Sequence, residues 1–200
     1  MSRSEHRIPT MDEPDRSSTP PQEADDQPPP SRTSGIAPSP IELDVHDVSR
    51  VLTDQELITL QKLTLRVLGQ LPNTGSVRVR IVSDQEMVNA HDQFCGLSTT
   101  TDVLTFDLAQ QDTNFDSKVL DTDLIVCVDE AQRQASTRQH IFVHELLLYI
   151  IHGVLHCLGH DDHDDDAFAR MHTQEDKLLT SAGIGAIFSS ESTPSKGYES

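Results

Sequence analysis

Four short segments with the apolar patterns of extended chain predict four β-strands. Residues 41–45 and 77–82 alternate with a period of two, which is typical of a strand with one buried face. Residues 102–106 form a third short segment of this kind. Residues 123–128 are almost continuously apolar, so we expect this strand to be buried on both faces.

Helical spacing of apolar residues between and after these strands predicts five helices. They are expected at about 53–69, 83–94, 129–137, 140–158 and 164–182. The helix at 140–158 is the longest and most apolar, and Gly159 is placed to end it as a left-handed C-cap. We therefore expect an α/β (α+β) fold, with a small mixed four-stranded sheet and helices mostly on one side.

The two ends of the chain lack this periodicity. Residues 1–39 hold most of the prolines and few large apolar side chains, so burial cannot offset the entropy lost on ordering. Residues 185–200 are similarly polar. We predict disordered tails at 1–39 and 185–200 and one folded domain at 40–184, long enough for a single core.

Composition and charge narrow the possible environments and partners. No run of 18 apolar residues predicts a membrane span, and the start of the chain has no apolar signal segment. Three scattered cysteines argue against a disulfide framework, so we expect a cytoplasmic protein. The net charge of −18 has the wrong sign for long-range attraction of nucleic acid, so an RNA partner would need local positive charge or a metal ion.

Two histidines in the long apolar helix have the spacing of metal ligands. His152 and His156 are four residues apart, so both imidazoles lie on one helix face and can reach a common ion. Gly159 lets the chain reverse, so that a third ligand can return from the following Asp/His cluster. Three protein ligands with an open position are typical of catalytic zinc. A pair of surface histidines is the alternative, which the apolar helix disfavours.

A zinc-peptidase motif is incomplete in this chain. His144 and Glu145 match the start of HExxH, but Leu148 stands where the second histidine would be. After the ligand His152, Gly153 stands where the peptidase has its catalytic glutamate. A peptidase-like metallohydrolase is therefore a secondary hypothesis.

The metal segment, H-G-V-L-H-C-L-G-H-D-D-H from His152 to His163, resembles the signature H-G-x-L-H-L-x-G-Y-D-H of the YbeY family. Members of that family are metal-dependent single-strand endoribonucleases of rRNA maturation and ribosome quality control. Residues 101–106 are similar to the family strand T-D-V-L-S-F, and 123–126 to G-D-I-V. The resemblance spans about 41–180. It implies one zinc ion, hydrolysis of RNA phosphodiester bonds, and an rRNA precursor or ribosome as partner.

The chain departs from the family pattern at three positions. The third family ligand, a histidine, corresponds to Asp162, with His163 one residue further; spacing favours Asp162, and the choice stays open. The family tyrosine is His160, and the family arginine is Cys95. Arg78 and Arg80 are candidates to replace that arginine charge, with a solvated strand face as the alternative.

These considerations give a set of candidate roles. His152, His156 and Asp162 are the predicted metal ligands, and His91 or Asp161 is the predicted group that moves protons. A surface helix histidine is the alternative for His91. The competing function is a ribosome-assembly protein with a structural metal and no turnover.

Overall fold

The computed structural model describes residues 41–109 and 119–186. The predicted N-terminal tail, and all but the first two residues of the predicted C-terminal tail, lie outside the described residues. The proposed boundaries of the folded domain therefore stay a prediction.

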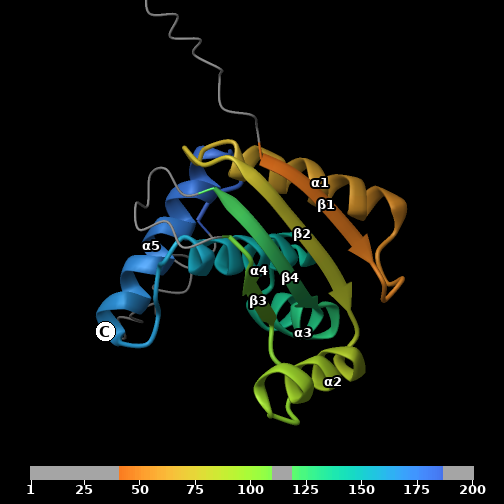
Figure 1. Ribbon diagram of the computed structural model, residues 1–200. Helices are drawn as coiled ribbons and strands as arrows, with labels where there is room; N and C mark the ends of the chain where they lie inside the picture. Colours follow the sequence, from red (N-terminus) through yellow and green to blue (C-terminus); the bar gives the residue numbers. More distant parts are fainter. Residues whose placement is uncertain (1–40, 110–118, 187–200) are drawn as a thin grey trace, which may run out of the picture. The chain divides into compact units, whose positions relative to one another are not determined.

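The four strands form one mixed sheet, as expected. They are β1 (Ile41–Asp47), β2 (Gly75–Val82), β3 (Val103–Asp107) and β4 (Leu120–Cys127), in the order β1-β2-β4-β3. β1, β2 and β4 are parallel, whereas β3 pairs antiparallel with β4 (Figure 1). β4 is therefore hydrogen-bonded on both sides, to β2 and to β3.

The prediction that the fourth strand is buried on both faces is wrong for most of its length. β4 begins at Leu120 and alternates: Leu120, Thr122 and Leu124 are buried, and the residues between them are only partly so. Asp121 and Asp123 lie on the less covered face, where Arg78 of β2 contacts both. The polar start of the strand is therefore stabilised by a cross-strand ion-pair cluster, which periodicity does not show.

Five helices lie in the described residues, close to their predicted positions. They are α1 (Asp54–Leu68), α2 (Asp84–Cys95), α3 (Val128–Arg138), α4 (Phe142–Cys157) and α5 (Asp165–Ser181). Capping boxes at Thr53 with Glu56 and at Ser83 with Glu86 begin α1 and α2. Gly159, just after α4, has a φ of 89°, as a left-handed C-cap requires.

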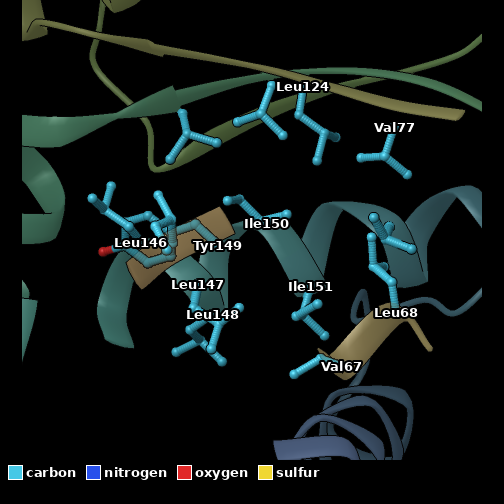
Figure 2. Packing of buried hydrophobic residues seen from close by; sticks show 14 of the residues in the cluster. Val67, Leu68, Val77, Leu124, Leu146, Leu147, Leu148, Tyr149, Ile150 and Ile151 are labelled. Atoms are coloured by element: carbon cyan, nitrogen blue, oxygen red, sulfur yellow. The ribbon is translucent and has the colours of Figure 1, made fainter. Parts of the chain in front are cut away.

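Helix α4 is the centre of the hydrophobic core, and its side chains are buried almost all round. Every residue from Leu146 to Ile151 is at most 5% exposed. In Figure 2, Ile150 lies between α4 and Leu124 of the sheet, whereas Leu147 and Ile151 lie on the far side of the helix. Burial of each large aliphatic side chain contributes roughly 1.5–3 kcal/mol, so α4 is a firmly held support for the groups it carries.

Gly153 allows α4 to approach the sheet closely. A Cβ atom at this position would lie 2.8 Å from Leu124 Cδ2 and 2.9 Å from Thr105 Oγ1. The position therefore requires the absence of a side chain. Close packing against the sheet is therefore the reason for a glycine at this position. Its correspondence to the catalytic glutamate of a peptidase motif is not needed to explain it.

None of the helices in the described ranges is by itself long and apolar enough to cross a membrane. Only α3 and α4 taken together, which meet at a bend of 118°, have the length and composition.

Candidate metal centre

The structure brings the three predicted metal ligands together. His152 and His156 lie in the last turns of α4 with their Nε2 atoms 3.1 Å apart. The chain turns back after Gly159 and places Asp162 beside them. Its carboxylate oxygens lie 3.6 Å from His152 Nε2 and 3.7 Å from His156 Nε2. One ligand atom from each of the three residues therefore lies within 4.8 Å of the other two.

Both imidazole rings are oriented through their other nitrogen. His156 Nδ1 lies 3.1 Å from the backbone oxygen of His160, and His152 Nδ1 lies 2.8 Å from Glu175 Oε1. A carbonyl or carboxylate oxygen only accepts, so each Nδ1 carries the proton and donates. In the neutral rings both Nε2 atoms then present lone pairs toward each other and toward Asp162.

This donor set fits a divalent cation. Two ring nitrogens and a carboxylate facing one another are mutually repulsive unless a positive charge lies among them. Zinc bonds of 2.0–2.2 Å at tetrahedral angles separate the donors by about 3.3–3.6 Å, close to the spacings observed. Two histidines and one carboxylate suit zinc and also other first-row metals, so the donor set does not by itself select the ion.

Glu175, which lies on α5, is a functional residue that sequence reasoning missed. Its side chain is fully buried and contacts both His152 Nδ1 and His172 Nδ1, the latter at 2.5 Å. Burial lowers the pKa of His152, but the hydrogen bond and charge of Glu175, together with the charges of Asp102 and Asp162, raise it overall. A glutamate on the apolar face of a helix, three residues after a histidine, was the available signal.

Asp161 and His163 form a separate, exposed pair. Asp161 accepts from the ring of His163 and from the backbone N–H groups of Asp162 and His163. This contact lowers the pKa of Asp161 and raises that of His163. His163 Nδ1 comes within 3.8 Å of Asp162, and Asp161, Asp162 and His163 form a second, more exposed cluster of possible ligand atoms that His152 and His156 do not join. The geometry thus supports Asp162 over His163 as third ligand, and the catalytic role of Asp161 stays a prediction.

A cavity of about 460 Å³ extends from the metal group along the surface of α4. Its wall is formed by the segment before β3, by α3, α4 and α5, and by the loop at Asp162. The lining residues are Thr100, Thr101, Asp102, Glu130, Gln134, Arg138, Leu148, Tyr149, His152, Asp162, Phe168 and His172. The metal group therefore lies on the wall of a site with room for a ligand.

Other candidate residues lie away from this cavity. His91, on α2, donates its Nδ1 proton to the backbone oxygen of Thr99 at 2.7 Å and does not line the cavity. Arg78 and Arg80 line a different cavity on the face of the sheet that carries Asp123. The role of His91 stays a prediction, and neither arginine is placed beside the metal group.

The positive charge on the wall of this cavity comes from Arg138, at the end of α3. Its guanidinium donates to Glu145 Oε1 at 3.0 Å, and Glu145 also accepts from the ring of His140. Glu145 is fully buried, whereas Arg138 is one-quarter exposed. The cavity therefore has a metal group at one end and an arginine, held by a buried carboxylate, at the other.

The sequence is similar to proteins of one family. The family model for Endoribonuclease YbeY matches residues 45–183. Endoribonuclease YbeY of Shouchella clausii is 27% identical over 156 residues, which are 72% of this chain and 97% of that protein. The Chloroflexus aurantiacus protein of the same name is 30% identical over 139 residues, 67% of this chain and 90% of its own. A solution structure from Thermotoga maritima is 23% identical, covers 80% of this chain and 99% of its own, and has a TM-score of 0.42. The chain belongs to the endoribonuclease YbeY family, whose members are metal-dependent hydrolases.

Proposed function

We propose that this protein is a zinc-dependent endoribonuclease that cleaves single-stranded RNA in the cytoplasm, in rRNA maturation and ribosome quality control. The observation that carries the proposal is the convergence of His152, His156 and Asp162 on one point, with both Nδ1 atoms already engaged. Family membership supplies the reaction class, hydrolysis of an RNA phosphodiester.

Some residues of the site bind the metal ion, and others orient the residues that bind it. His152, His156 and Asp162 hold the ion, while Glu175 and the His160 carbonyl fix the two rings. Zinc, when bound, supplies Lewis acidity toward a phosphoryl oxygen. Asp161 is the proposed proton-moving group beside the ligands, and the hydrogen bond from His163 lowers its pKa, so it is ionised at neutral pH.

Arg138 and the hydroxyls of Thr100 and Thr101 bind the RNA backbone along the cavity. Glu145, which holds Arg138, precedes His152 by seven positions on α4. At 1.5 Å per residue this places them about 10 Å apart along the helix. Arg138 therefore meets a phosphate neighbouring the one that reacts. It supplies local positive charge that the overall composition lacks.

The test combines metal content with cleavage of a single-stranded RNA. Elemental analysis is expected to give near one zinc per chain in the wild-type and His163→Ala proteins, and none in His156→Ala and Asp162→Ala. Cleavage should disappear on chelation and return with added zinc. Undiminished cleavage by metal-free protein would contradict the proposal.

Other outcomes identify the competing functions. One tightly bound zinc with no RNA turnover at any metal loading would indicate an assembly protein with a structural metal. Hydrolysis of a peptide or ester with inert RNA would indicate a peptidase-like metallohydrolase.

A further inference from the structure

Phe168 exposes a large aromatic ring inside the cavity of the metal group. It lies in the first turn of α5, is 50% exposed, and lines the cavity together with His152 and Asp162. The neighbouring residues Ala167 and Met171 are buried in the core. Because this exposed ring lines the same cavity as two of the metal ligands, it is placed to contact a ligand bound there.

The ring is fixed relative to the metal group through His172. Phe168 packs edge-to-face with His172, with ring centroids 3.9 Å apart and planes at 84°. His172 in turn lies nearly parallel to His152 at 6.4 Å, and Glu175 contacts both histidines. Phe168 is therefore held a short, defined distance from His152, within reach of a nucleotide next to the reacting phosphate.

Charge explains why an aromatic contact is needed here. The chain carries a net charge of −18, and Asp102 and Glu130 also line the cavity. Attraction of phosphates supplies most of the affinity of basic nucleic-acid-binding proteins, and it is weak in this molecule. Stacking of a base on an aromatic ring does not depend on charge and contributes roughly 1–3 kcal/mol per base.

We propose that Phe168, supported by His172, is a stacking platform for a nucleobase of single-stranded RNA adjacent to the metal group. The proposal rests on the proposed function and specifies how that site binds its substrate. It also gives a physical basis for preferring single strands, because a base inside a duplex has both faces covered by its neighbours and cannot lie on the ring.

The kinetic test replaces the ring and keeps its apolar bulk. Phe168→Leu is expected to raise KM for a single-stranded RNA roughly 5- to 150-fold, the factor that corresponds to the loss of one stacked base. We expect kcat to stay nearly constant, because stacking is present in both the ground and the transition state. The matched control is Phe94→Leu, since Phe94 is equally exposed but lines the other cavity, against Phe106.

A second readout is independent of turnover. The chain has no tryptophan, so Phe168→Trp introduces a single one that can stack and report. Its fluorescence is expected to be quenched by a single-stranded oligonucleotide and much less by a duplex, whereas that of Phe94→Trp should not respond. Zinc content near one per chain in every variant shows that the metal group is intact.

Two results would overturn the stacking platform. One is a wild-type KM in Phe168→Leu, and the other is equal quenching of Phe168→Trp and Phe94→Trp. Failure of the wild-type protein to cleave RNA is a different result, which defeats the proposed function. The fluorescence titration then still decides whether a base binds at Phe168.

Discussion

Two fully buried glutamates, Glu145 on α4 and Glu175 on α5, have similar surroundings and different consequences. Each is held between two basic side chains: Glu145 between Arg138 and His140, and Glu175 between His152 and His172. Both flank the same cavity through their partners.

The difference lies in the chemistry of the partners. Arg138 has a guanidinium group, which only donates and does not bind a metal ion, and its contact with Glu145 joins the end of α3 to α4. The partners of Glu175 are imidazoles, and one of them presents its second nitrogen to the metal group. We infer that Glu145 stabilises the fold. Glu175, by contrast, orients the metal ligand His152, and it does so only when α5 packs against α4.

The largest effect is expected from Glu145→Ala. Removal of this carboxylate leaves Arg138 and His140 without their shared counter-charge, and the free energy of unfolding should fall by about 3–5 kcal/mol. Urea unfolding of chelated and zinc-loaded protein measures it, and both forms should lose the same amount. A loss below about 1 kcal/mol would mean that the pair is not a main support of the fold.

Glu175→Gln tests the other half of the comparison. Glutamine has one accepting oxygen for two donating imidazoles and carries no charge, so the ring of His152 is held less firmly and zinc affinity is expected to fall roughly 10- to 100-fold. Titration against a competing chelator gives this number, with Glu145→Gln as the matched buried control. Equal loss of affinity in both variants would remove the distinction between the two glutamates.

Gly153→Ala separates packing from ligation. The added methyl group meets Leu124 and Thr105 at under 3 Å, so we expect the free energy of unfolding to fall by about 1–3 kcal/mol. Because Gly153 faces the sheet and not the cavity, the folded variant should retain its zinc. Thermal unfolding and elemental analysis on the same sample check both statements, and loss of zinc at unchanged stability would contradict them.

The smallest effect on stability is expected from the carboxylate of Asp84, which is exposed, unlike those of Glu145 and Glu175. Arg133 binds Asp84 in a bidentate manner and holds the pKa of Asp84 well below its ordinary value of 3.8. A lowered folded pKa means that this stabilisation is complete above the ordinary value and is lost as the pH falls below it. Asp84→Asn should therefore cost at most about 1 kcal/mol at neutral pH, since the pair is exposed.

The measurement is the difference in unfolding free energy between the wild-type and Asp84→Asn proteins as a function of pH. The unfolding free energies of wild-type and Asp84→Asn proteins are expected to converge as the pH falls from 5 toward 2. A difference that stays constant over this range would show that the charge of Asp84 does not contribute.

Much of the fold follows from local sequence, because its determinants are local. The capping boxes at Thr53 and Ser83 lie within four residues of the helix starts they set, and Gly159 ends the long helix by its own conformation. The polar start of β4 was missed because Asp121 is stabilised by Arg78, a residue of another strand. Such a contact leaves no trace in the periodicity of either segment.

In the site, too, residues close in sequence could be predicted, whereas contacts between distant helices could not. His152 and His156 follow from helix geometry, whereas Asp162 is proposed because it corresponds to the third ligand of the family signature, with His163 as the alternative. Glu175 acts only because α5 packs against α4, and Arg138 reaches Glu145 only because of the bend between α3 and α4. Both depend on helix packing, which a single sequence does not specify.

The short span of the predicted ligands also bears on folding. The segment from His152 to Asp162 is one helical turn and a loop, so little loop-closure entropy opposes its assembly around an ion. We therefore expect this segment to bind a divalent ion before the sheet has formed, whereas Glu175 joins only when the last helix docks. If the denatured chain also binds the ion, the metal should raise the melting temperature by less than its affinity for the native protein implies.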